Sequence, residues 1–376
     1  MNPNYSKLFE PFTFASGVTI NNRVIMAPMT TNSSFENGMV TTDEHNYYKR
    51  RAAGLGAVIT SCAQVMENGK FAGSLSAASD NRIESLSKLA KSIQSTGAKA
   101  ILQIFHVGRM GTSRTLRGEQ PVSASAVPAL RDFAETPRAL SDEEVRELVT
   151  AYGEATRRAI LAGFDGVELH GANTYLIQQF FSPHSNRRDD FWGGTLEKRM
   201  NFPLAVVQAA KEAIKTYAEK PFILGYRISP EEMEEPGITL DDTLQLVAKL
   251  KNQGLDYLHV SVGNVMQRSM RDKSNKKPII QILQEQVGKD FPIIGVGLIQ
   301  TPDEAINALD LGIPLIAVGR ELIVEPDWIK KVKEGKEDAI RTEIHPQDRA
   351  DLMLPDAMWE YVESNPGWLP IVETNR

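Results

Sequence analysis

Short runs of apolar and β-branched residues recur along the chain, and longer stretches with helical periodicity separate most of them. A bounded apolar run is typical of a buried strand, whereas apolar residues that repeat about every three or four positions are typical of an amphipathic helix. The clearest periodic stretches predict helices over residues 141–162 and 240–253. The apolar runs predict strands over residues 24–27, 57–61, 100–105, 166–170, 222–227, 257–261, 293–297 and 315–318.

Signals at the helix starts agree with this alternation. Ser141 and Glu144 have the spacing of a capping box, in which each side chain binds the backbone of the other residue. Pro302 follows Thr301 at a predicted first helical position, where a missing N–H costs nothing. Each signal marks the start of a helix that follows a predicted strand, shortly after it at Thr301 and after a long loop at Ser141.

Eight strands alternating with helices indicate an α/β protein with a (β/α)8 TIM barrel. A doubly wound sheet would require a glycine-rich fingerprint after its first strand, and Pro28-Met29-Thr30-Thr31 is not one. We expect a single domain over residues 1–376, with residues 341–376 as a C-terminal extension. Two decorations are predicted as well: a hairpin around residues 15–17 that caps the N-terminal end, and a long loop after strand three, residues 106–140, that covers the catalytic face.

Composition narrows the possible partners. A net charge of −6 and a pI near 5.7 argue against nucleic acid and against anionic membrane surfaces. The one cysteine, Cys62, excludes iron–sulfur clusters and intramolecular disulfides, and its apolar surroundings predict a buried, inert thiol. No apolar stretch approaches the roughly 18 residues of a membrane span, so we expect a cytoplasmic protein.

Polar residues gather where the predicted strands end, which is where barrel enzymes carry their functional groups. The densest group is His170, Asn173 and Tyr175, three hydrogen-bond donors within six residues. His170 and Asn173 could bind one electronegative atom together, and Tyr175 could deliver a proton. A metal site completed by Glu168 or Asp190 is the less favoured alternative, and we expect none.

A second group has the character of a phosphate site. Gly295, Gly297, Gly319 and Arg320 would bring backbone N–H groups and a guanidinium to the loops after strands seven and eight, where barrels often bind phosphate. Glycines that serve only packing are the alternative explanation for the first two.

Three further residues are ambiguous from the sequence. Arg227 closes an apolar strand and needs an anion, which could be a structural carboxylate or a ligand. Gln103 lies inside an apolar run, either as a hydrogen-bonded core amide or as a two-sided contact to a planar heterocycle. For His106 we favour a role in anchoring a loop.

Together these segments resemble the Old Yellow Enzyme family of FMN-dependent NAD(P)H oxidoreductases over nearly the whole chain. The matching segments are Leu8-Phe9-Glu-Pro, Asn22 to Thr30, Gln103 to Arg109, Glu168 to Tyr175, Phe181 to Asp190 with Gly193, Gly194 and Arg199, Gly295 to Gly297, and Gly319-Arg320-Glu321. Some family members have a cysteine where this chain has Thr30, and an aromatic residue just after it.

The resemblance implies FMN on the catalytic face. It places Thr30 near a flavin carbonyl, Gln103 at the pyrimidine edge, and Arg227 where reduction adds negative charge. The cofactor-binding residues that it implies are Ala27, Pro28, Met29, Thr30, Gln103, Arg227, Gly295, Gly297, Gly319 and Arg320.

The resemblance also implies a ping-pong reaction in which NAD(P)H reduces FMN and an activated alkene oxidises it. His170 and Asn173 would bind the carbonyl or nitro oxygen of a small-molecule substrate, and Tyr175 would protonate the α-carbon. The same site could instead reduce quinones, nitro compounds or nitrate esters. A non-redox lyase or isomerase with a phosphorylated substrate is an alternative from another class, for which Glu168 is the sole candidate base. The physiological substrate, the NADH or NADPH preference, a possible homo-oligomer and the role of the tail stay open.

Overall fold

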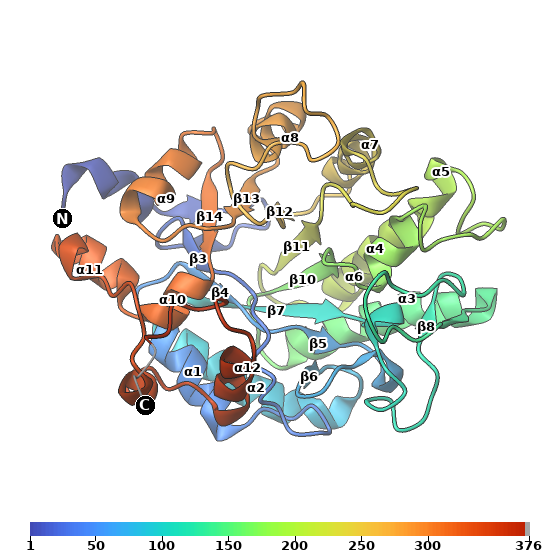
Figure 1. Cartoon of the computed structure of the whole chain (residues 1–376), viewed down its shortest axis with the longest axis horizontal. Helices are drawn as coiled ribbons and strands as arrows, with labels where there is room; N and C mark the ends of the chain where they lie inside the picture. Colours follow the sequence, from blue (N-terminus) through green and yellow to red (C-terminus); the bar gives the residue numbers. More distant parts are fainter. Residues whose placement is uncertain (373–376) are drawn as a thin grey trace.

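Eight parallel strands close into a barrel, and helices surround it (Figure 1). The computed structural model describes residues 1–372. The barrel strands are β3 (Val24–Met26), β4 (Ala57–Ile59), β7 (Lys99–Phe105), β10 (Gly166–Gly171), β11 (Ile223–Ile228), β12 (Tyr257–Val260), β13 (Ile293–Val296) and β14 (Leu315–Val318). Because β10 pairs with both β11 and β7, the sheet has no free edge within this ring, which confirms the barrel and rules out the open, doubly wound sheet. All eight predicted strands are present, with ends within two residues of the prediction.

The connections after each strand supply the outer layer of helices. They are α1 (Thr42–Ala52), α2 (Ile83–Gln94), α3 (Asp142–Leu161), α4 (Leu176–Phe181), α5 (Leu196–Arg199), α6 (Asn201–Tyr217), α7 (Leu240–Lys251), α8 (Ile279–Val287), α9 (Pro302–Leu309), α10 (Arg320–Val324), α11 (Trp328–Glu334) and α12 (Asp356–Ser364). The capping boxes at Ser141 and Thr301 are both formed, as predicted. None of the helices in residues 1–372 has the length and apolar character that crossing a membrane requires.

The N-terminal hairpin closes one end of the barrel. Strands β1 (Phe12–Thr13) and β2 (Thr19–Ile20) pair antiparallel, and Phe14 between them joins the cluster of side chains that fills the barrel interior. The backbone N–H of Ser16 donates to Asp256 Oδ1 at 2.7 Å, while Asp256 Oδ2 accepts from the N–H of Leu224 at 2.8 Å. One carboxylate therefore ties the hairpin to the start of β11, and the predicted cap is confirmed.

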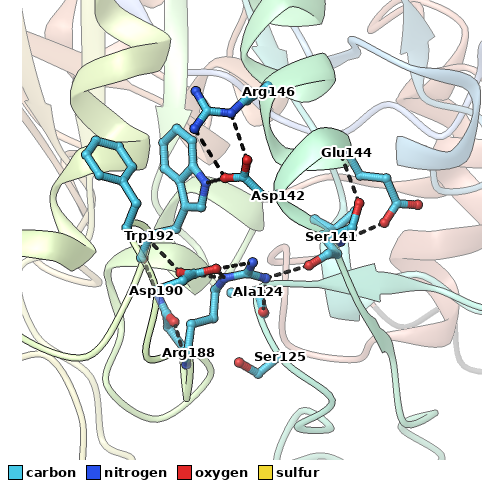
Figure 2. Close-up of polar contacts among 12 residues, drawn as sticks. Ala124, Ser125, Ser141, Asp142, Glu144, Arg146, Arg188, Asp190 and Trp192 are labelled. Carbon is cyan, nitrogen blue, oxygen red and sulfur yellow. Dashed lines mark hydrogen bonds and ion pairs between the residues drawn. The ribbon is translucent and has the colours of Figure 1, made fainter.

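The loop after β7 is held to the rest of the molecule by an arginine from a distant segment. Arg188 Nη1 donates to the carbonyl oxygens of Ala124 at 3.0 Å and Leu140 at 2.5 Å, and its guanidinium pairs with Asp190 (Figure 2). Asp190 also accepts from the N–H of Trp192 at 2.9 Å. The run at residues 181–194 thus contributes a clamp on the long loop.

The C-terminal segment packs on the barrel. Leu354, Trp359 and Leu369 belong to the same buried cluster as the helices and the outer faces of the strands. Near the end of the described chain, Ile344 forms a parallel bridge with Ile371. Figure 1 shows this segment, in red, over the side of the barrel where α10 lies.

The contribution of the N-terminal hairpin, which plugs one end of the barrel with Phe14, can be tested by two phenylalanine substitutions. Phe14→Ala should lower the free energy of unfolding by about 3 kcal/mol, because it opens a cavity inside the barrel. Phe133→Ala serves as the control: this side chain is 98% exposed, so its loss should change stability by less than about 0.5 kcal/mol. Chemical denaturation measures both values. Equal effects would mean that the hairpin is not a plug.

Candidate active site

Two adjoining cavities lie beyond the carboxyl ends of the strands. The smaller has a volume of about 490 Å³ and the larger about 1030 Å³. Pro28, Met29 and Trp368 line both of them. The loop after β3 therefore forms one shared wall and the C-terminal segment forms another, which assigns the tail a place at the site.

The smaller cavity has the components of the predicted phosphate site. Gly297, Gly319 and Arg320 line it. A Cβ at Gly297, whose φ is +122°, would lie 2.7 Å from the carbonyl oxygen of Val262, so only glycine fits there without strain. Arg320 is exposed and donates to the carbonyl oxygen of Trp368 at 3.3 Å. This contact connects the cavity wall to the tail.

Gly295 lies elsewhere. It is absent from the cavity wall, and a Cβ there would fall 2.5 Å from Ile313 Cδ1 in the layer outside the barrel. The space that a side chain at Gly295 would occupy is therefore already filled by packed side chains. Gly295 lies within β13, whereas Gly297 lies beyond its end with a positive φ. The two glycines therefore have different surroundings, although alternation along a continuous strand would place them on the same side.

Arg227 is a buried cation in the wall of the smaller cavity. It is 7% exposed, its Nε has no hydrogen-bond partner, and no carboxylate within residues 1–372 lies within ion-pair distance of it. Burial lowers the pKa of the guanidinium and Glu168 raises it, but an arginine stays charged. A structural ion pair, one of the two explanations open from the sequence, is not formed in the described part of the chain. The cation faces space in which an anionic group would satisfy it.

Gln103 and Glu168 face each other at one level of the barrel. They are register partners on β7 and β10, and Gln103 Nε2 donates to Glu168 Oε1 at 2.7 Å. The other carboxylate oxygen accepts from Tyr257 Oη at 3.0 Å and from His259 Nδ1 at 2.9 Å. No group of three metal-binding side chains converges in the described part of the chain.

His170 lies near the end of β10, two residues after Glu168, and Asn173 lies just beyond the strand. His170 is 2% exposed, and burial, with the charge of Arg227, holds its pKa well below the usual range, so the ring is neutral. Asn173 is exposed and has a φ of +54°, which asparagine tolerates better than most residues. Its Oδ1 accepts from Ser261 Oγ at 2.8 Å, which leaves the amide N–H groups to donate elsewhere.

Tyr175 lines the larger cavity and stands among aromatic rings. Its ring lies 5.0 Å from that of Phe105 and 4.9 Å from that of His170, both edge to face, and 6.4 Å from that of Phe71. Burial raises the pKa of the phenol, so it carries its proton at neutral pH. The cavity wall therefore contains a neutral group that is able to donate a proton.

Sequence reasoning missed Gln179, which holds this loop in place. Its Oε1 accepts from the N–H of Arg109 at 3.0 Å and from Ser123 Oγ at 2.8 Å, and its Nε2 donates to the carbonyl oxygen of Thr174 at 2.6 Å. It therefore ties the residue before Tyr175 to the loop after β7. The one indication of this role in the sequence is that Gln179 places an amide within the apolar run of α4.

Two residues behave as their sequence context predicted. His106 is buried with a pKa lowered to about 3 by burial; its Nδ1 accepts from the N–H of Gly108 at 3.1 Å and its Nε2 contacts Asn68 at 3.1 Å, so it anchors the loop. Cys62 is buried, and burial raises the pKa of its thiol, which makes it a poor nucleophile.

Comparison with known proteins identifies this arrangement. A family model described as the NADH:flavin oxidoreductase / NADH oxidase family matches residues 7–339. The chain belongs to this family, that of Old Yellow Enzyme. A solved structure of the Old Yellow Enzyme homologue from Zymomonas mobilis superposes with a TM-score of 0.76 at 27% identity, covering 87% of this chain and 92% of that one.

Three relatives illustrate the range of the family. "Probable NADH-dependent flavin oxidoreductase YqiG" of Bacillus subtilis is 47% identical over 98% of this chain and 99% of its own length. NADH:acrylate oxidoreductase of Vibrio harveyi is 46% identical over 95% of this chain but only 36% of its length. NADH:fumarate oxidoreductase of Klebsiella pneumoniae is 44% identical over 94% of this chain and 39% of its length. The last two are much longer proteins.

Membership of this flavin oxidoreductase family makes the protein an FMN-dependent oxidoreductase that uses NADH or NADPH, and it removes the non-redox lyase or isomerase from consideration. The residues present fit the cofactor. Arg227 supplies a buried cation that has no ion-pair partner among residues 1–372, and a glycine-lined cavity opens beside it. FMN offers a phosphate and a ring that becomes more negative on reduction, which are the groups that such a wall can satisfy.

The smaller cavity also contains a carboxyl group with a perturbed pKa. Glu321 is 5% exposed, and burial, Glu325 and Glu304 together raise its pKa to about 7. In the unfolded chain this carboxyl group has a pKa near 4.5 and loses its proton at a lower pH than it does in the folded state. The free energy of unfolding should fall as the pH rises through the interval between these two pKa values.

The substitution Glu321→Gln should remove this dependence. Between pH 5.5 and pH 8 the wild-type protein should lose about 2 kcal/mol more than the variant, since a tenfold difference in proton affinity between the folded and unfolded states corresponds to about 1.4 kcal/mol. Denaturant titrations at both pH values, with the same FMN concentration, give the difference. Parallel profiles would show that Glu321 titrates normally.

Proposed function

We propose that the protein reduces the carbon–carbon double bond of alkenes that a carbonyl or nitro group activates. The observation that carries this proposal is Tyr175, a protonated phenol in the wall of the larger cavity, in ring contact with His170. Reduction of a double bond adds a hydride, which carries both electrons, to one carbon and a proton to the other. A neutral tyrosine at the cavity wall is suited to donate that proton as a general acid.

His170 and Asn173 bind the activating oxygen. Both are neutral donors: burial keeps His170 uncharged, and Ser261 occupies the acceptor side of the Asn173 amide. As the β-carbon is reduced, negative charge grows on the carbonyl or nitro oxygen, and donors already fixed in place stabilise that charge without reorganisation. The resulting anion is then protonated at its α-carbon by Tyr175.

Bound FMN would supply the redox chemistry, the hydride transfer that links NADH or NADPH to the alkene. The residues proposed to hold it are Ala27, Pro28, Met29, Thr30, Gln103, Arg227, Gly295, Gly297, Gly319 and Arg320. All of these except Thr30, Gln103 and Gly295 line the smaller cavity, and Thr30 lines the larger one. Among these, Gly295 contributes only through its backbone, because its Cα faces the packed outer layer. Trp368 lines both cavities and so would separate cofactor and substrate space from solvent.

The rim of the larger cavity favours alkenes that carry a carboxylate. Lys70 and Arg117 are both ion-paired with Glu36, whereas Arg114 makes no ion pair within residues 1–372. A free arginine is a ready partner for a carboxylate. The acrylate and fumarate named for two long relatives are unsaturated acids, which supports this class, although those activities belong to proteins of which this chain spans about a third.

Tyr175→Phe tests the proton-donor assignment. Reduction of FMN by NAD(P)H should proceed within about threefold of wild type, whereas oxidation by an enone or unsaturated acid should slow by about 10²-fold or more, the usual contribution of a general acid. Stopped-flow absorbance of the flavin follows the two half-reactions separately. Tyr217→Phe, a partly exposed phenol at the end of α6, is the matched control and should leave both rates unchanged. Equal slowing of both half-reactions by Tyr175→Phe would refute the assignment.

The proposed binding of the substrate oxygen by His170 and Asn173 can be tested without turnover. A phenolate presents the same kind of charged oxygen as the reduced substrate, so His170→Ala with Asn173→Ala should weaken phenol binding by about tenfold or more, the value of one charged hydrogen bond. Titration of the flavin absorbance with a para-substituted phenol measures the dissociation constant. An unchanged titration would mean that the two side chains do not meet the ligand oxygen.

A further inference from the structure

Glu168 is a fully buried carboxylate that the proposed reaction does not use. It lies on β10 two positions before His170, on the same side of the strand, and its side chain is 0% exposed. A base or a metal ligand would need a free oxygen. Both oxygens of Glu168 are instead occupied, one by Gln103 and the other by Tyr257 and His259.

The surrounding barrel is built to hold this carboxylate. Gln103 is its register partner on β7, and its partner on β11 is Gly225. A Cβ at Gly225 would lie 2.1 Å from Cζ of Tyr257. The absence of a side chain at Gly225 therefore lets the Tyr257 ring pass from β12 to reach Glu168.

Polar and charged neighbours keep Glu168 ionised. Burial would raise the pKa of Glu168, but His259, Arg227 and Gln103 lower it further than burial raises it. Burial lowers the pKa of His259, so this ring is neutral and donates its Nδ1 proton to the carboxylate. One negative charge thus lies inside the barrel beneath the ends of the strands.

An ionised carboxylate can only accept hydrogen bonds, which fixes the orientation of the Gln103 amide. Nε2 must face Glu168, and Oε1 is left as the available polar atom; no group within residues 1–372 donates to it. A heterocyclic ring beside Gln103 would therefore face the acceptor Oε1, which could accept a hydrogen bond from an N–H on the edge of the ring.

The same carboxylate offsets the charge of Arg227. The two side chains do not form an ion pair, yet Glu168 is the largest favourable influence on the Arg227 pKa. Arg227 is in register with His170 on one side and His259 on the other, and both of these rings are neutral. The balance of charge at this level therefore depends on one cation and one anion.

We propose that Glu168 is a positioning residue for the flavin: it orients Gln103 so that its amide oxygen faces the cofactor, and its charge partly cancels that of Arg227, which keeps the reduction potential of the bound flavin low. This role rests on the FMN cofactor and is independent of the acceptor that the enzyme reduces.

Glu168→Gln in the FMN-loaded protein tests the proposal. Loss of the negative charge leaves Arg227 uncompensated, so the flavin should become easier to reduce, with at least a tenfold shift toward the reduced form, or about 30 mV more positive for a two-electron couple. Redox titration followed by absorbance measures this. Tyr257→Phe removes one hydrogen bond to the same carboxylate but keeps its charge, and it should shift the balance less than twofold. No shift in Glu168→Gln, or an equal shift in both variants, would overturn the charge role.

A second variant keeps the proposal testable if Glu168→Gln does not fold. His259→Leu removes a donor that lowers the pKa of Glu168 and puts no other N–H in its place, so the carboxylate should begin to protonate as the pH falls. The potential of this variant should then rise more steeply than that of wild type between pH 7 and pH 5.5. Parallel plots of potential against pH would contradict the proposal.

Discussion

The register of β10 between β7 and β11 is the constraint on which the site depends. It places Glu168 opposite Gln103 and His170 opposite Arg227. Because side chains alternate along a strand, a shift of one residue would turn Glu168 and His170 out toward the helices. Closure of the barrel fixes that register on both sides, since β10 has a hydrogen-bonded neighbour at each edge. The chemistry of the site is therefore set by the same hydrogen bonds that close the sheet.

Burial of polar groups gives the site its properties. His170 is neutral because it is buried beside Arg227, and Tyr175 keeps its proton because apolar rings surround it. Burial thus moves the pKa of each group away from neutral pH, so both side chains remain uncharged hydrogen-bond donors. Arg227 stays charged and finds no ion-pair partner in the described chain. The site therefore presents uncharged donors around one cation, an arrangement suited to a reaction in which negative charge appears and is then removed.

The sequence predicted the barrel well because its evidence was local. Each strand was a short apolar run, and each marked helix start carried its own capping residue, so neither required knowledge of distant contacts. Glycine and arginine at the ends of the last strands indicated a phosphate site for the same reason. The cluster at His170, Asn173 and Tyr175 was visible because its three members lie within six residues of one another.

What sequence reasoning could not supply depends on long-range contacts. Trp368 reaches both cavities from far along the chain, and Gln179 joins two loops through an amide that looked like an interruption of an apolar helix. Glu168 is the sharpest case. Its sequence position, two residues before His170, left a base or a metal ligand open, and only the three donors that converge on it from β7 and β12 show that it has no free oxygen for either role. A buried carboxylate can thus be identified as a support for its neighbours once its own hydrogen-bonding capacity is counted, and this count requires the tertiary structure.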